Sequence, residues 1–161
     1  MPNLWSNLDF SGASRTVSLR SVQACVRRSR GSKTTRAIMG QHALSHSDVL
    51  KYVTRHCKNL EHLEIKGGLK IRSLVEAAVL ASNLTSLVVS FESETTLDAV
   101  SLLLAKCRKL ERAEFQNVLS SGALATWAGD MSNLRCLNVN AGRTQTLGFT
   151  ALNLVSTLTS R

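Results

Sequence analysis

The sequence predicts an α/β fold in which short strands alternate with helices and the strands lie together in one parallel sheet. Three observations support this prediction. A pattern of the form L-x-x-L-x-L recurs, with steps of 24, 26 and 24 residues between its clearest copies. Between the copies, apolar residues follow the spacing of an amphipathic helix. The apolar fraction, 43%, is large enough for a core, and the aromatic fraction, 4%, makes that core mostly Leu, Val and Ala.

The pattern marks six candidate strands. Its four clear copies begin at Leu60, Leu84, Leu110 and Leu134. Two weaker copies precede them, and the pattern positions there hold Trp5, Leu8, Phe10 and then Thr34, Ala37, Met39. We expect strands near residues 7–10, 36–39, 62–66, 86–90, 111–115 and 135–139.

The segments between the strands place apolar residues three or four positions apart, as one face of a helix does. In "SLVEAAVLA" that face is Leu74, Val75, Ala78 and Val79. Ser47 precedes one apolar run, and Thr95 or Thr96 another, where they can act as helix N-caps. The candidate helices cover residues 18–29, 47–57, 73–81, 95–107, 122–131 and 150–158.

A short strand followed by a helix every 24–26 residues is typical of leucine-rich repeats. One such unit cannot bury its apolar face alone, so neighbouring units stack into a solenoid. We therefore expect a horseshoe-like solenoid of about six strand–helix repeats of 24–29 residues, with a parallel sheet on its concave face. One domain over residues 1–161 is predicted, with 1–33 as a linker and first repeat and 34–161 as the repeats.

The cysteines fit this repeat without a chemical role. Cys57 and Cys107 each stand three residues before a strand anchor, where Ala81 and Met131 stand in other repeats. The remaining two, Cys25 and Cys136, complete a set of four that contains no CxxC pair, so no metal site is predicted. We expect the thiols to be buried and structural.

Alternation along each strand sorts its side chains into two faces. Leu63 and Ile65 are predicted to point into the core, and the residues between them to point out from the concave face. Solenoids commonly bind protein partners on this surface. The predicted protein-binding residues are His62, Glu64, Lys66, Ser86, Val88, Arg112, Glu114, Gln116, Asn138 and Asn140, with Ser90 and Cys136 on the same face.

The net charge of +9 is concentrated in the first half of the chain. Its densest part is a basic patch at Arg20, Arg27, Arg28, Arg30, Lys33 and Arg36. Such a cluster can attract nucleic acid or anionic lipid. No aromatic residues are interleaved for base stacking, which favours a solvated helix face over a nucleic-acid site.

Motifs for catalysis or cofactor binding are weak. Gly31-Ser32-Lys33-Thr34 has Ser where a phosphate-binding loop needs the second Gly before its Lys. His42 and His46 have a metal-ligand spacing but lack a third ligand, so we expect no metal and no cofactor. No catalytic constellation stands out, and a non-enzymatic protein is predicted. Neither a signal peptide nor an 18-residue apolar run is present, which predicts an intracellular protein of the cytoplasm or nucleus, not a membrane protein.

The opening phrase resembles a known family. Pro2, Leu4, Trp5, Leu8, Asp9, Phe10 and Ser11, followed by Arg15, Val17, Arg27, Arg28, Ser29 and Gly31, are similar to the segment after the F-box helices in F-box/leucine-rich-repeat proteins of filamentous fungi. The phrases "NLEHLEI" and "KLERAEF" also resemble repeats of that family, so the resemblance covers essentially the whole chain.

The resemblance implies a substrate receptor of a Skp–cullin–F-box ubiquitin ligase, which acts in the ubiquitin conjugation pathway through protein–protein interaction. The F-box of such a protein docks on the Skp adaptor, and its helices are expected upstream of Met1, so the Skp adaptor and cullin are partners only with that F-box. Two alternatives remain open. One is a repeat scaffold unrelated to ubiquitin, and the other is a basic nucleic-acid-binding module.

Overall fold

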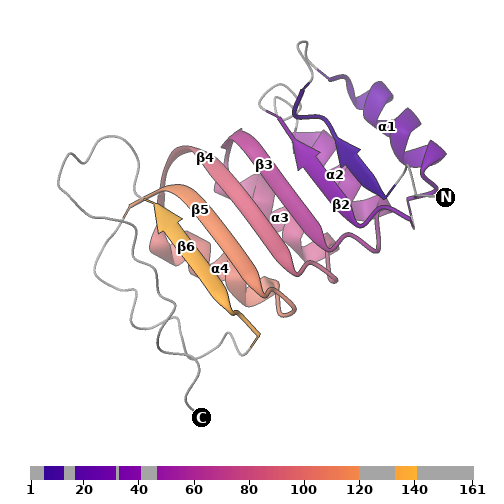
Figure 1. Ribbon diagram of the computed structural model, residues 1–161. Coiled ribbons are helices and arrows are strands. Elements are labelled where there is room, and N and C mark those ends of the chain that lie inside the picture. The colour runs from indigo at the N-terminus through magenta and orange to yellow at the C-terminus, as the bar shows by residue number, and fades with distance from the viewer. Residues whose placement is uncertain (1–5, 13–16, 32, 41–46, 120–132, 141–161) are drawn as a thin grey trace.

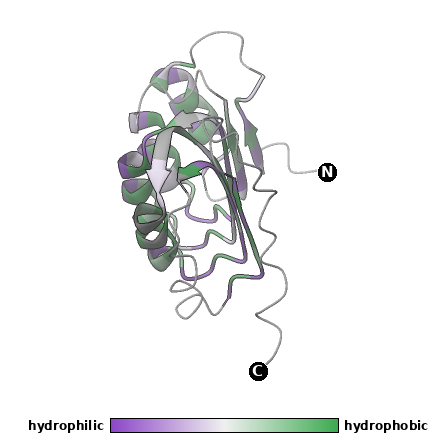
Figure 2. Cartoon of the chain, turned by 90° about the vertical axis from the view of Figure 1, so that its left-hand side faces the viewer, coloured by the Kyte–Doolittle hydropathy of each residue, from purple (hydrophilic) through white to green (hydrophobic). Residues whose placement is uncertain are grey.

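The structure is a computed structural model that describes residues 6–12, 17–31, 33–40, 47–119 and 133–140. Strands and helices alternate along the chain, and the strands form one parallel sheet whose order follows the sequence (Figure 1). The helices cover one face of the sheet (Figure 2). The elements are β1 Asn7–Asp9, α1 Leu19–Arg28, β2 Arg36–Met39, α2 Ser47–His56, β3 His62–Leu69, α3 Ile71–Leu80, β4 Ser86–Thr96, α4 Leu97–Lys106, β5 Arg112–Leu119 and β6 Cys136–Asn140.

The strand register confirms the repeat spacing read from the sequence. Equivalent positions of the L-x-x-L-x-L copies are direct partners across the sheet. One row of partners is Leu8, Ala37, Leu63, Leu87, Ala113 and Leu137. A second row, two residues further along, is Met39, Ile65, Val89, Phe115 and Val139.

A ladder of shared backbone acceptors fixes where each strand starts. The carbonyl of Glu61 accepts hydrogen bonds from the backbone N–H groups of Thr85, at 2.8 Å, and Ser86, at 2.9 Å. The same two-donor arrangement occurs at every junction from β1 to β6, with carbonyl acceptors at Ser6, Thr35, Glu61, Thr85 and Glu111. Because buried backbone groups need hydrogen-bond partners, this ladder joins the start of each strand to the start of the next one.

Three strands run further than the sequence predicted. The ladder shifts register between Ile65 and Leu69 and again between Ser90 and Thr95, and pairing then resumes. A bulge of this kind lets a strand bend and continue. The continuation buries Leu69, Phe91 and Val118, and the rings of Phe91 and Phe115 stack with centroids 6.0 Å apart.

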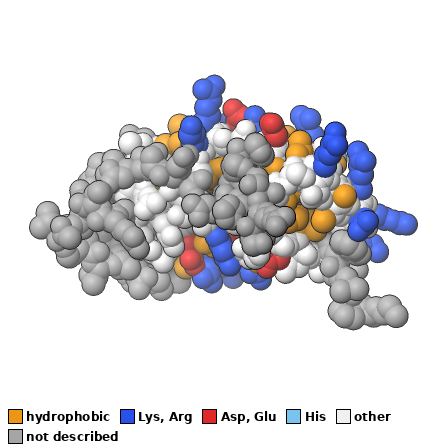
Figure 3. Space-filling model, turned by 90° about the horizontal axis from the view of Figure 1, so that it is seen from above, with side chains coloured by type: hydrophobic (Ala, Val, Ile, Leu, Met, Phe, Trp, Pro, Cys, Tyr) orange, Lys and Arg blue, Asp and Glu red, His pale blue; other side chains and the backbone are white. Residues whose placement is uncertain are grey.

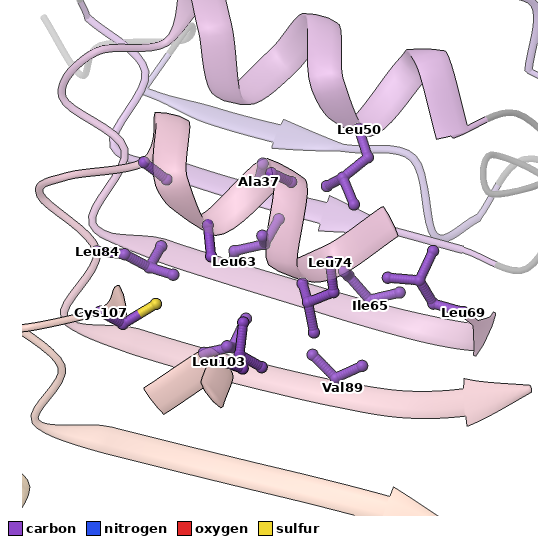
Figure 4. Packing of buried hydrophobic residues seen from close by; sticks show 14 of the residues in the cluster. Ala37, Leu50, Leu63, Ile65, Leu69, Leu74, Leu84, Val89, Leu103 and Cys107 are labelled. Carbon is purple, nitrogen blue, oxygen red and sulfur yellow. The ribbon is translucent and has the colours of Figure 1, made fainter. Parts of the chain in front are cut away.

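The core lies between the sheet and the helices, and Figure 4 shows Leu50, Leu74 and Leu103 of three helices in the layer that also holds Leu63 and Val89. One predicted core position is wrong. Val79 is 61% exposed, and Ala77 is buried instead. Helix α3 buries Leu74, Ala77 and Ala78, which share one face at the i, i+3, i+4 spacing, and Val79 lies outside that face.

The helix starts also differ in part from expectation. Thr96 stands at the N-cap of α4, but its side chain makes no capping hydrogen bond. At α1, by contrast, the Ser18 hydroxyl accepts from the backbone N–H of Ser21 at 3.2 Å. The predicted helices at 122–131 and 150–158, with Met131 and Trp5, lie outside the described residues.

The repeated small-residue position is confirmed for Cys57, Ala81 and Cys107, which are all buried. Each follows a helix, and its carbonyl accepts a hydrogen bond from the strand anchor three residues on, at 3.0 to 3.2 Å. Burial raises the pKa of both thiols, that of Cys107 to about 11, while a hydrogen bond with Thr34 partly offsets the rise at Cys57. The other two thiols depart from the prediction, because Cys25 and Cys136 are only half-buried.

Candidate functional site

The candidate site is the face of the sheet that the helices leave open, here called the outer sheet face. It carries the alternate residues predicted from the sequence, all of them half-buried or exposed. Two rows of register partners cross it. The first is Arg36, His62, Ser86, Arg112 and Cys136, and the second is Ile38, Glu64, Val88, Glu114 and Asn138. Ser90, Gln116 and Asn140 form a third row.

Glu64 is the electrostatic centre of the first half of this face. Its carboxylate oxygens lie 3.5 Å from Arg36 Nη2 and 3.6 Å from Lys66 Nζ. The Glu64 side chain is 20% exposed, whereas those of Arg36 and Lys66 are about half exposed. One partly shielded acid therefore holds two cations at the surface, where a partner's carboxylate or carbonyl can still reach them.

His62 lies beside Glu64 and is fixed by a neighbouring strand. Its Nδ1 forms a 2.8 Å hydrogen bond with the Ser86 hydroxyl. The other ring nitrogen, Nε2, is 3.7 Å from Glu64 Oε2, is buried and has no hydrogen-bond partner among the described residues. Burial lowers the pKa of His62, the charge of Arg36 lowers it further, and Glu64 opposes the shift. The ring is therefore held neutral at pH 7.

Arg112 and Glu114 form a second charged group on β5. The Arg112 Nε donates to Glu114 Oε1 at 3.0 Å, and an Arg112 terminal nitrogen contacts the same oxygen. This pairing raises the pKa of Arg112. On β6, in register with Glu114, the side-chain oxygen of Asn138 is buried and lacks a hydrogen-bond partner within the described segments. The second half of the face thus carries a paired charge and a buried, unsatisfied acceptor.

The basic patch predicted from the sequence is divided by the fold. Arg20, Arg27 and Arg28 are exposed on α1, and Arg30 and Lys33 are exposed in the turn that follows it. Figure 3 shows Lys and Arg side chains projecting at the right-hand end of the molecule, where α1 lies in Figure 1. Arg36 does not belong to this group, because it stands on β2 and pairs with Glu64 on the outer sheet face.

The segment that resembled a phosphate-binding loop ends a helix instead. Gly31 has a φ of +54°, and its N–H donates to the carbonyl of Val26 at 3.1 Å, which closes the end of α1. Thr34 is buried, and its hydroxyl donates to Ser29 Oγ at 3.1 Å. The Gly31 N–H and the Thr34 hydroxyl therefore form hydrogen bonds within the fold, which does not fit a phosphate-binding loop.

Other site candidates can be placed only in part. His42 and His46 lie outside the described residues. Within the described segments, no group of three or more His, Cys, Asp or Glu residues is placed to hold a metal ion. None of the described helices has the length and apolarity needed to cross a membrane.

Sequence reasoning missed the hydrogen bond between His62 and Ser86 and the position of Glu64 beside the same ring. A Ser–His–carboxylate triad needs hydrogen bonds on both ring nitrogens, and Nε2 of His62 has none within the described residues. Here the residues come from two strands and the serine bonds Nδ1, so no local spacing indicates the contact. The repeat in the sequence could have indicated this contact, because its 24-residue step makes residues 62 and 86 register partners.

Sequence reasoning also missed a polar tie between repeats. The Asn83 amide donates to the carbonyl of Lys58 at 3.0 Å, and the Asn133 amide donates to the carbonyl of Arg108 at 2.9 Å. Both asparagines directly precede a strand anchor, Leu84 and Leu134. Lys109 occupies the equivalent position in the repeat between them and donates to Asn83 Oδ1 at 2.6 Å.

Comparison of the chain with protein-family models, with curated proteins and with solved structures finds no match.

Proposed function

We propose that this chain is a leucine-rich-repeat solenoid that recognises a protein partner through the outer sheet face. The single observation that carries the proposal is the register. Equivalent positions 24 to 29 residues apart pair directly through six strands, and each junction repeats the same shared-carbonyl hydrogen bonds. Stacked units of one kind, each touching its sequence neighbours, are the defining property of a solenoid.

The chemistry of the outer sheet face supports protein recognition. The face offers charge of both signs, from Glu64 with its cations and from the Arg112–Glu114 pair. The uncharged Ser86 and Val88 lie between these groups. A wrong partner leaves such groups unpaired, and this is how an interface rejects it. Solenoids present this side of the sheet to partners.

The more specific proposal is a substrate receptor of a Skp–cullin–F-box ubiquitin ligase. It rests on the resemblance of the opening phrase around Pro2, Trp5 and Asp9 to the segment after an F-box. In this proposal the F-box supplies the adaptor contact and the outer sheet face holds the substrate. The alternative is a repeat scaffold that uses the same face outside the ubiquitin system.

Binding to the Skp adaptor distinguishes the two. We expect residues 1–161 alone not to co-purify with the adaptor at micromolar concentration, because the family docks through F-box helices. The same residues fused behind an F-box should bind it and should transfer ubiquitin to a co-captured protein. A stable complex of the adaptor with residues 1–161 alone would contradict this docking model. Adaptor binding without any substrate ubiquitination by the fusion would favour the scaffold.

The recognition surface is tested by exchanging charges. Glu64→Lys with Arg112→Glu should abolish capture of the partner that the unaltered chain binds. The matched control exchanges the Arg72–Glu76 pair of α3, whose closest charged atoms are 3.8 Å apart on the helix side. Equal losses in both variants would place the binding surface elsewhere.

A further inference from the structure

The edge of the sheet where the strands begin has an excess of positive charge. Because the strands are parallel and alternate with helices, every connection from a helix to the next strand lies on this edge, which runs along the lower ends of the strands in Figure 1. The connections span residues 27–35, 55–61, 80–85, 106–111 and 133–135. Their described Lys and Arg residues, here called the basic edge, are Arg27, Arg28, Arg30, Lys33, Arg55, Lys58, Lys106, Arg108, Lys109 and Arg135.

These ten cations are exposed and nearly uncompensated. The same connections contain only two acidic residues, Glu61 and Glu111. Among the described residues, no member of the basic edge forms an ion pair with a carboxylate, whereas Arg36, Lys51, Lys66, Arg72 and Arg112 all do. Within the part of the chain that the structure describes, Lys109 is the only member of the basic edge whose side chain forms a hydrogen bond, and its partner is the neutral Asn83. The charge is therefore available to a ligand.

A stabilising interaction with a helix dipole explains the presence of fewer than half of the ten cations. A cation in the last turn of a helix interacts favourably with the helix dipole, and the effect fades beyond that turn. Arg27, Arg28, Arg55 and Lys106 occupy last turns. The other six lie in the connections, where the dipole gives no reason for them.

The spacing of the charge indicates what kind of ligand fits. Six strands are separated by five steps of about 4.8 Å, so the edge is roughly 24 Å long and carries a cation about every 2.4 Å. A fully acidic extended peptide offers one charge per roughly 3.4 Å. Duplex nucleic acid offers one charge per about 1.7 Å of its axis. The basic edge therefore carries more charge per unit length than an extended peptide, and less than a duplex.

We propose that the basic edge binds the phosphate backbone of double-stranded nucleic acid, without reading its sequence. The edge is separate from the outer sheet face, so the two surfaces can be occupied together. Lys and Arg contacts to phosphate position a protein on a duplex, and they carry no sequence information. The lack of interleaved aromatic residues, which weakens a single-strand interpretation, is consistent with this mode.

The test measures binding of residues 1–161 to a labelled duplex of random sequence by fluorescence anisotropy between 50 and 200 mM salt, concentrations over which phosphate contacts are expected to weaken strongly. The edge variant carries Lys58→Gln, Lys106→Gln and Arg108→Gln. The control variant removes the same charge with Arg20→Gln, Lys70→Gln and Arg72→Gln, which are exposed and lie at or near helix starts. Circular dichroism checks that both variants remain folded.

We expect the unaltered chain to bind, and the slope of log K against log salt to be smaller by about 2 to 3 in the edge variant. The control variant should keep the slope of the unaltered chain. An equal decrease of the slope in both variants would mean that only the net charge of the protein matters, and would overturn the proposal. Tighter binding of poly-glutamate, or of a single strand of equal length, would overturn it in favour of an acidic protein or a single-strand ligand. No binding at 50 mM salt would also overturn it.

Discussion

His62 and Ser86 are 24 residues apart in the sequence and share a 2.8 Å hydrogen bond across neighbouring strands. They are direct register partners on β3 and β4, so the repeat length itself brings them together. The bond fixes the imidazole on the outer sheet face and leaves the other ring nitrogen next to Glu64. The centre of the proposed binding surface is thus already ordered before a partner arrives.

The coupling between these two residues can be measured with a double-mutant cycle. Ser86→Ala should lower the free energy of unfolding by about 0.5–1.5 kcal/mol, because Nδ1 loses its partner. In a His62→Phe background the same change should cost much less, which gives a coupling energy above about 0.5 kcal/mol. Urea unfolding of the four proteins supplies the values. Additive effects would show that the bond contributes nothing to stability.

The lowered pKa of His62 predicts a pH dependence of stability. Burial holds the folded-state pKa below the ordinary value of 6.5, so the unfolded chain binds the proton more readily. Stability from this group is therefore complete above 6.5 and is lost as the pH falls from 6.5 toward the folded-state pKa. The measurement is urea unfolding at half-unit steps from pH 7.5 to 5. A His62→Gln variant should lack this part of the pH dependence, and an unchanged profile in that variant would contradict the assignment.

Much of the fold could be predicted because the pattern occurs six times. A strand assigned in one copy can therefore be checked against the equivalent positions of the other five. The steps of 24 and 26 residues fixed the strands, their order and the side of the sheet on which Leu63 and Glu64 lie. The bulges after Ile65 and Ser90 were not predictable in the same way, since they depend on pairing between neighbours, not on a pattern within one copy. The misplaced Val79 has a different cause, because the predicted set from Leu74 to Val79 spans a wide arc of the helix and the sequence does not show which edge of that arc packs on the sheet.

The candidate site was predicted as a set of positions but not as a set of contacts. Alternation alone placed Glu64 and Arg112 on the outer sheet face. It could not show that Arg36, assigned to the basic patch, pairs with Glu64. Nor could linear charge counting show the basic edge, because its members are scattered from Arg27 to Arg135 and meet only when the helix ends align.

Two glycines make a matched test of backbone geometry. Gly31 has a φ of +54°, and a Cβ there would lie 2.3 Å from the backbone oxygen of His56. Gly31→Ala should therefore destabilise the protein by at least about 1–3 kcal/mol. Gly12→Ala is the control, since nothing lies within 4 Å of its Cβ position. Thermal unfolding should show a clear fall in Tm for the first and little change for the second, and similar Tm values would contradict the described end of α1.

The four thiols should separate into two classes by reactivity. Cys57 and Cys107 are 1% and 6% exposed and have raised pKa values, so little thiolate is present at pH 8. Cys25 and Cys136 are half-buried. Maleimide labelling followed by mass spectrometry should modify Cys25 and Cys136 first, and should reach the other two only in urea. Early modification of Cys107 in the native protein would mean that the space between α4 and the sheet is open.

The inward and outward assignment of the strands can be tested at two positions. Leu63 is 1% exposed between the sheet and the helices, and Leu63→Ala should cost about 2–5 kcal/mol in the free energy of unfolding. Gln116 is exposed on the outer sheet face, and Gln116→Ala should change that free energy by less than about 0.5 kcal/mol. Urea unfolding at pH 7.5, where His62 is neutral, keeps its titration out of the comparison. A comparable loss at both positions would mean that the alternation is wrong on β5, and would remove Arg112, Glu114 and Gln116 from the proposed binding surface.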